Sequence, residues 1–196
     1  MILYHSKNTR SVGTLVLLEE LGAKYELKRL DIRAGENRTP EYLAVNPMGK
    51  VPALEHNGTI ITEQVAIYIY LADLFPEAKM APLIGDSLRG SYLRWMAFYG
   101  SCFEPAVVDR SLKRDAGPVS MSPYGSFDLM LNTLLGQLKA GPWLLGEKLT
   151  ALDVLYGGAL GWMTKFELVP SSAIVKGYVE RFNERPAVKR VQSMDA

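Results

Sequence analysis

Two short stretches carry residue types that could hold a small peptide. Residues 46–54 form a turn that runs into a strand beginning with Val-Pro, and residues 62–67 end a strand with a Glu-Gln pair that opens a helix. Between them, Asn57-Gly58 predicts a tight hairpin, because both central positions of such a turn need a positive φ. The hairpin brings the free backbone groups of a strand start close to the anion-attracting amides of a helix N-terminus. We therefore predict a peptide-binding corner here.

The elements that must position this corner alternate between strand and helix. A short apolar strand precedes an amphipathic helix that Gly22 ends, and Thr39-Pro40 predicts the N-cap and first position of a second helix. The crossover between the first two strands requires parallel pairing and the hairpin is antiparallel, so the sheet is expected to be mixed. The predicted order is βαβαββα, with strands at residues 2–5, 25–30, 51–55 and 59–62 and helices at residues 10–21, after residue 39, and at 63–74.

The rest of the chain carries helical patterns. Asp86 is predicted to cap a long helix that Pro105 bends or interrupts. Shorter helices are predicted at residues 126–138, 150–165, 171–183 and 186–194. The fold class is therefore α/β plus all-α, with an α/β domain at residues 1–76, a linker at 77–85 and an all-helical domain at 86–196.

One local motif in the helical half is specific. Thr150 with Asp153 three residues later resembles a capping box, and Leu149 and Val154 occupy the positions of a hydrophobic staple. Glycine and alanine residues follow in the same helix, so we expect a buried helix held by its cap and by close packing.

Composition excludes several classes of function. The formal net charge is +1, which gives no reason to expect a nucleic acid or a membrane as partner. Cys102 is the only cysteine, so an intramolecular disulfide and a Cys-based metal cluster are excluded, and His5 and His56 lack ligand-like neighbours for a metal. No apolar run of about 18 residues is present, and a cytoplasmic location is expected.

Four motifs in this order resemble the cytosolic glutathione transferases over nearly the whole chain. Residues 46–54 resemble the cis-proline motif of the family, residues 62–67 its glutathione-anchoring motif, residues 149–153 its helical capping box and residues 185–188 its closing segment. The resemblance implies a thioredoxin-like N-terminal domain, glutathione as co-substrate, and no metal. Because no cysteine stands in the turn after the first strand, the cysteine-bearing bacterial class is not the one resembled.

The resemblance assigns the glutathione contacts. Val51, before a cis bond to Pro52, would pair its backbone with the cysteinyl unit, while Glu63 and the N–H of Gln64 would hold the γ-glutamyl end and Lys50 the glycyl carboxylate. Alternatively, Pro52 is an ordinary strand start, Glu63 complements a helix dipole and Lys50 is a solvated turn residue. Gln64 replaces the usual Ser of the motif, so a hydroxyl contact is lost there.

Catalysis is expected in the turn after the first strand, where a donor and a helix N-terminus would stabilise the glutathione thiolate. Ser6 has the spacing of serine-type classes, while Asn8 and Thr9 resemble glutathione-dependent disulfide reductases, and Arg10 falls where the cysteine-bearing class has Cys. The register is ambiguous, since Asn8 or Thr9 could instead be an N-cap and Ser6 a plain turn residue.

The resemblance also implies a second substrate site and a dimer. Tyr99 and Phe103, four residues apart on the long helix, would line the site for an apolar electrophile, or would belong to the core. Family members are commonly homodimers, and Met48 lies where several classes place a residue that enters the partner.

Three functions remain open from the sequence. The first is a glutathione transferase that directs the thiolate at an apolar electrophile. The second is a glutathione-dependent disulfide reductase or peroxidase, which the Asn8-Thr9 pair favours. The third is a non-catalytic interaction module, against which the intact Val51-Pro52 and Glu63 motif argues.

Overall fold

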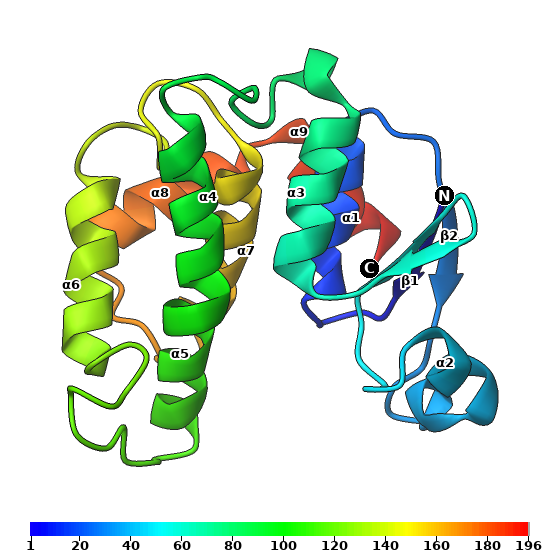
Figure 1. Cartoon of the computed structure of the whole chain (residues 1–196), viewed down its shortest axis with the longest axis horizontal. Coiled ribbons are helices and arrows are strands. Elements are labelled where there is room, and N and C mark those ends of the chain that lie inside the picture. The colour runs from blue at the N-terminus through cyan, green and yellow to red at the C-terminus, as the bar shows by residue number, and fades with distance from the viewer. Residues whose placement is uncertain (196) are drawn as a thin grey trace. The chain divides into compact units, whose positions relative to one another are not determined.

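The computed structural model describes residues 1–195 as two compact units (Figure 1). Met1–Met80 and the C-terminal segment from Arg185 form the first unit, and Ala81–Glu184 form the second. The ranges of these units differ from the predicted domains at the end of the chain, because the last helix belongs with the α/β unit. Among the described residues, every helix is too short or too polar to cross a lipid bilayer.

The first unit is built on a four-stranded sheet in the order β2-β1-β3-β4. Strand β1 (Ile2–His5) pairs parallel with β2 (Glu26–Arg29) and antiparallel with β3 (Ala53–His56), which pairs antiparallel with β4 (Thr59–Ile61). The predicted mixed sheet and the βαβαββα order are therefore confirmed.

Helices α1 (Ser11–Glu20) and α3 (Gln64–Leu74) pack closely together. A Cβ atom on Gly13 would lie 2.5 Å from the Tyr68 hydroxyl oxygen, so glycine permits this approach. The Gln64 amide then reaches the main chain of α1 and donates from Nε2 to the Arg10 carbonyl at 3.1 Å. The N-termini of α1 and α3 are thus brought to one place.

Helix α2 (Pro40–Val45) is short and is positioned by one aromatic contact with the sheet. Its only buried residue, Tyr42, forms a cluster with Tyr4 of β1 and Ala53 of β3. Thr39 is its N-cap, as predicted, and accepts a hydrogen bond from the Tyr42 N–H. The first unit also contains two single turns of 3₁₀ helix. One, Glu36–Arg38, precedes α2, and the other, Pro76–Ala78, follows α3.

The last helix, α9 (Pro186–Met194), packs against α1 (Figure 1). Arg185, at its N-cap, forms a bidentate pair with Glu20 at 2.9 and 2.7 Å, and Arg190 pairs with Glu19 at 2.8 Å. Planar two-point contacts of this kind are specific in geometry. They explain why the closing segment joins the α/β unit although the sequence pattern around it is helical.

The second unit contains α4 (Arg89–Phe98), a π-helical turn (Tyr99–Phe103) and α5 (Glu104–Ser111) in one continuous run. The predicted interruption at Pro105 takes the form of this wide turn, in which the Glu104 N–H donates to the Tyr99 carbonyl.

The prediction that Asp86 caps the helix is wrong. Asp86 accepts from the Leu88 N–H at 2.8 Å, in a turn that precedes the first helical residue.

Three further helices complete the second unit: α6 (Phe127–Leu138), α7 (Ala151–Lys165) and α8 (Ala173–Asn183). The predicted capping box of α7 is present, with the Thr150 N–H donating to Asp153 Oδ2 at 2.7 Å. Asp153 Oδ1 also accepts from the Leu144 N–H and the Tyr178 hydroxyl, each at 2.7 Å. This fully buried carboxylate therefore joins α7, α8 and the loop before α7.

Candidate functional site

The strand registers bring three chain segments together at one end of the sheet. Tyr4 is paired with Ala53, so continuing the antiparallel register by two residues places Ser6 opposite Val51. Leu54 is paired with Ile61, so the same continuation places Glu63 opposite Pro52. Neighbouring strands lie about 5 Å apart, so this continued register sets Ser6 beside Val51 on one side of β3 and Glu63 beside Pro52 on the other side. The peptide-binding corner and the turn after β1 are therefore parts of one site.

Val51 lies just before β3, and its peptide bond to Pro52 is cis, as the family resemblance implied. Among residues 1–195, no hydrogen bond engages the N–H or C=O of Val51. The preceding carbonyl of Lys50, by contrast, is fixed by the Tyr42 hydroxyl at 2.6 Å and the Asn46 amide at 2.8 Å. The turn is thus held rigidly while the Val51 peptide groups remain available for a ligand.

The turn before Val51 is also fixed from its other side. Gly49 has φ +59°, and a Cβ there would lie 2.7 Å from the Asn37 carbonyl oxygen. The Asn37 side chain donates to the Gly49 carbonyl at 2.8 Å, and Arg38 donates to the Met48 carbonyl at 3.2 Å. The Lys50 side chain is exposed.

Glu63 has an unusual backbone for a residue with a side chain. Its φ of 63° and ψ of 114° place it outside the allowed regions for L-residues, and it forms the N-cap of α3 with no side-chain hydrogen bond to the helix. Such outliers cost about 1–3 kcal/mol and concentrate at functional sites. The exposed carboxylate of Glu63 is therefore held beside the helix N-terminus but is not used to cap it.

Gln64, the first residue of α3, has its side chain turned inward. Nε2 donates to the Arg10 carbonyl at 3.1 Å and to the Tyr68 hydroxyl at 3.4 Å, while the buried Oε1 has no partner within the described residues. Its N–H belongs to the first turn of the helix, where backbone donors have no intrahelical acceptor. The predicted backbone role is thus compatible with the structure, and the side chain instead joins α3 to α1.

The turn between β1 and α1 is closed by hydrogen bonds of Ser11 and Thr9. Ser11 Oγ accepts from the Ser6 N–H at 3.0 Å, and Thr9 Oγ1 donates to the Ser6 carbonyl at 2.7 Å. Thr9 Oγ1 also accepts from the Ser11 N–H at 3.2 Å. The Thr9 hydroxyl therefore accepts the hydrogen bond of the first backbone N–H of α1, as an N-cap side chain does. By backbone conformation, however, the N-cap residue is Arg10.

Ser6 and Asn8 differ from Thr9 in where their side chains lie. Asn8 is exposed and adopts φ 57°, a left-handed conformation that asparagine tolerates well. Ser6 is 6% exposed, and its hydroxyl lines a cavity of about 680 Å³ together with Asn8. The structure thus places Ser6 and Asn8 in the wall of the cavity and directs the Thr9 hydroxyl into the turn.

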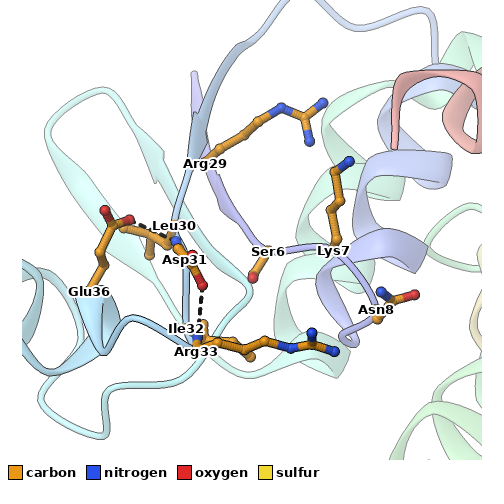
Figure 2. Close-up of a pocket in the computed structure, with 9 residues that line it drawn as sticks. All are labelled: Ser6, Lys7, Asn8, Arg29, Leu30, Asp31, Ile32, Arg33 and Glu36. Carbon is orange, nitrogen blue, oxygen red and sulfur yellow. Dashed lines mark hydrogen bonds between the residues drawn. The ribbon is translucent and has the colours of Figure 1, made fainter. Parts of the chain in front are cut away.

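The cavity lies between the β1–α1 turn and the connection that follows β2 (Figure 2). The Arg33 side chain extends toward Asn8 in this view, and the Arg33 backbone N–H donates to Asp31 Oδ1 at 2.9 Å. Asp31 and Glu36 use their carboxylates on backbone amides of the same loop. The residues that line the cavity are Ser6, Lys7, Asn8, Arg29, Leu30, Asp31, Ile32, Arg33 and Glu36.

Arg33 and Ser11 are site residues that the sequence interpretation missed. Ser11 could have been found from its position one residue past the N-cap, where a hydroxyl can return to the preceding turn. Arg33 lies in a loop without periodicity, and only the fold brings it to the cavity beside Ser6.

The predicted electrophile-site residues lie inside the second unit. Tyr99 is 3% exposed and Phe103 is fully buried. Their rings contact each other at 5.4 Å and the ring of Tyr156 at 5.2 and 5.5 Å between centroids. These are the contacts of an aromatic core, which was the alternative interpretation of this pair. Cys102 is half-buried, with Sγ 3.4 Å from the Pro123 carbonyl.

Comparison with known proteins gives a consistent result over both halves of the chain. Residues 1–73 match the model of the glutathione S-transferase N-terminal domain, and residues 127–186 match that of the glutathione S-transferase C-terminal domain. The chain is 26% identical to glutathione S-transferase GstA of Escherichia coli O157:H7, over 100% of this chain and 98% of the relative.

Solved structures agree with this assignment. A glutathione transferase from Methylococcus capsulatus superimposes with a TM-score of 0.84 at 29% identity, covering 99% of this chain and 98% of that one. A sphingomonad glutathione S-transferase complexed with glutathione superimposes with a TM-score of 0.79 at 27% identity, covering 100% and 98%. Together with the two domain models, these similarities show that the chain belongs to the glutathione S-transferase family.

Proposed function

We propose that this protein is a glutathione transferase that binds glutathione in its first unit and directs the thiolate at an apolar electrophile. The observation that carries the proposal is the convergence of three groups at one end of the sheet. These are the unpaired peptide groups of Val51, the α3 N-terminus with Glu63, and the β1–α1 turn with Ser6. The glutathione complex of the sphingomonad relative supports glutathione as the peptide.

Each part of glutathione has a complementary group in this arrangement. The cysteinyl N–H and C=O would pair with Val51 as an added strand does. The γ-glutamyl carboxylate would accept from the Gln64 N–H, and its amine would meet the exposed carboxylate of Glu63. Lys50 and Arg33, both exposed cations beside the site, would attract the glycyl carboxylate.

Catalysis would depend on stabilising the thiolate. A free thiol has a pKa of about 8.5, so a small fraction is ionised at neutral pH. The Ser6 hydroxyl is the favoured donor, because it lies opposite Val51 and lines the cavity, and the N-terminus of α1 adds a positive potential. With an aryl halide, the sulfur–carbon bond forms as the halide leaves, and the thiol proton passes to solvent.

The disulfide reductase alternative is favoured by one observation. Asn8 presents its side chain to the same cavity as Ser6. In that reaction the thiolate attacks a disulfide sulfur and releases a thiolate, so the same activation would serve.

We also expect a homodimer, with Met48 as an exposed apolar residue of the turn before Val51 (66% exposed).

The test is retention of the full chain on immobilised glutathione, followed by turnover of an aryl halide and of a small disulfide. Retention and aryl halide turnover are expected, and Glu63→Gln should weaken retention about tenfold by removing one charge pair. Glu41→Gln, an exposed first-turn acid of α2, is the matched control and should bind normally. Retention without either activity would favour a non-catalytic module, and no retention would refute the proposal.

A further inference from the structure

A buried histidine adjoins the proposed catalytic turn and has no role in the function described above. His5, the last residue of β1, is fully buried. Its Nε2 lies 3.0 and 3.1 Å from the two carboxylate oxygens of Asp195, which follows α9. Its Nδ1 lies 2.9 Å from Ser11 Oγ, at the start of α1. The imidazole thus joins the end of the chain to the turn that holds Ser6.

The charges around the ring decide which nitrogen carries the proton. Arg29 of β2 pairs with Asp195 Oδ1 at 2.6 Å. Burial alone would raise the pKa of Asp195, but Arg29 and His5 lower it below its ordinary value, so Asp195 is a carboxylate and only accepts. Nε2 of His5 must therefore carry a proton.

The other nitrogen is left without a proton. Burial lowers the pKa of His5 below its ordinary value, and Asp195 offsets only part of that shift, while Arg29 adds to it. The ring is neutral at pH 7, and Nδ1 is an acceptor.

The Ser11 hydroxyl has an acceptor on either side, His5 Nδ1 at 2.9 Å and the Ser6 carbonyl at 3.1 Å. Thr9 already donates to that carbonyl at 2.7 Å. The single Ser11 proton is therefore directed at the nearer and otherwise unserved acceptor, His5 Nδ1.

The consequence reaches Ser6 through two hydroxyl groups. With its proton on the His5 side, Ser11 Oγ accepts from the Ser6 N–H at 3.0 Å. Thr9 Oγ1 lies 2.7 Å from both the Ser6 carbonyl and Ser11 Oγ, so its proton is also used inside the turn. Both peptide groups of Ser6 are then tied, and Thr9 has no proton to offer to a ligand sulfur.

We propose that His5 is a positioning residue that sets the direction of the Ser11–Thr9 hydrogen bonds and so holds Ser6 at the catalytic turn, with Asp195 selecting the required tautomer. This proposal rests on the proposed glutathione transferase function only for its kinetic test. Moving the proton to Nδ1 would reverse the Ser11 bond and release the Thr9 proton from its place in the turn.

Two substitutions separate the two contacts of the ring. In His5→Asn, the amide oxygen can replace Nδ1 as the acceptor for Ser11, but the contact with Asp195 is lost. In His5→Gln, the amide can reach Asp195, but the acceptor for Ser11 is lost. We expect His5→Gln to lower kcat about tenfold with an unchanged KM for glutathione, since one hydrogen bond of the turn is lost while the anchoring groups are intact. His5→Asn should stay within about twofold of the unmodified protein.

Asp195→Asn tests the tautomer directly. Arg29 holds the oxygen of this side chain at the Oδ1 position, so the new NH₂ group takes the Oδ2 position, 3.0 Å from Nε2. A proton on Nε2 would then meet a second donor there and keep only the Oδ1 oxygen at 3.1 Å, which Arg29 already uses, so the variant favours an unprotonated Nε2. The ¹⁵N shifts of the His5 ring should show the proton on Nε2 in the unmodified protein and on Nδ1 in this variant, with a fall in kcat like that of His5→Gln. This spectroscopic result does not depend on the proposed function, whose failure would appear as loss of retention on glutathione.

Two controls remove comparable contacts elsewhere. His56→Gln changes the other histidine, whose Nδ1 bonds to the Tyr70 hydroxyl at 2.7 Å, and Arg190→Ala cuts the α9 ion pair with Glu19. Both should leave kcat unchanged. Equal kcat values for His5→Asn and His5→Gln, equal losses in both that follow a drop in thermal stability, or an Nδ1 proton in the unmodified protein would each overturn the proposal.

Discussion

Ser6, Asn8 and Thr9 differ in how their polar atoms are used, and this difference ranks them as candidates for the proposed activation of the thiol. Thr9 Oγ1 is surrounded by Ser6 and Ser11, whereas the Ser6 hydroxyl and the Asn8 amide line the cavity. Ser6 also has the register position opposite Val51. The sequence could only narrow the candidates to this turn. Choosing among them requires knowing which hydroxyl is hydrogen-bonded within the turn, and only the structure shows that.

At the residue scale, Ser6→Ala should raise the pKa of the bound glutathione thiol by about one unit, the effect of losing one charge-assisted hydrogen bond. Thr9→Ala should raise it less, because the Thr9 proton is used within the turn. Thiolate absorbance as a function of pH measures both. Asn8→Gly, which keeps the positive φ, separates the side chain from the backbone conformation at that position. If none of the three changes raises the pKa, thiol activation by this turn is wrong.

At the element scale, caps and turns were predictable and helix interruptions less so. Thr39, Ser126 and the Thr150–Asp153 pair cap their helices as their residue types suggest, because each bond is local in sequence. Asp86 failed as a cap because its side chain bonds two residues on, in a turn that delays the start of α4. The interruption near Pro105 was predicted, but its π-helical form has no local sequence signature.

Asp153→Ala should destabilise the second unit by about 3 kcal/mol, because it leaves the Leu144 and Thr150 amides and the Tyr178 hydroxyl buried without their acceptor. The melting midpoint should fall by roughly 6–12 °C. Asp128→Ala, an exposed first-turn acid of α6, is the matched control and should change the midpoint by about 1 °C. Equal midpoints for Asp153→Ala and the unmodified protein would contradict the role of this carboxylate.

At the scale of the whole molecule, the sequence predicted an α/β domain and a helical domain at residues 86–196, whereas the structure groups the segment from Arg185 with Met1–Met80. The ties of this segment to α1 and β1, from Arg185, Arg190 and Asp195, link residues more than 160 positions apart, which no local pattern reveals. The residues that we propose to anchor glutathione could be named from the sequence because Val51-Pro52 and Glu63-Gln64 lie in continuous motifs. Arg33, Ser11 and the His5–Asp195 pair required the fold.

The central claim is that glutathione binds across the Val51 peptide groups and the α3 N-terminus. Titration of the ¹⁵N-labelled protein with glutathione, followed by amide chemical shifts, tests it most directly. We expect saturable shifts of the Val51 and Gln64 amides, and a shift of Val51 without Gln64 when cysteinylglycine replaces glutathione. Saturable binding that leaves Val51 and Gln64 unshifted would contradict it.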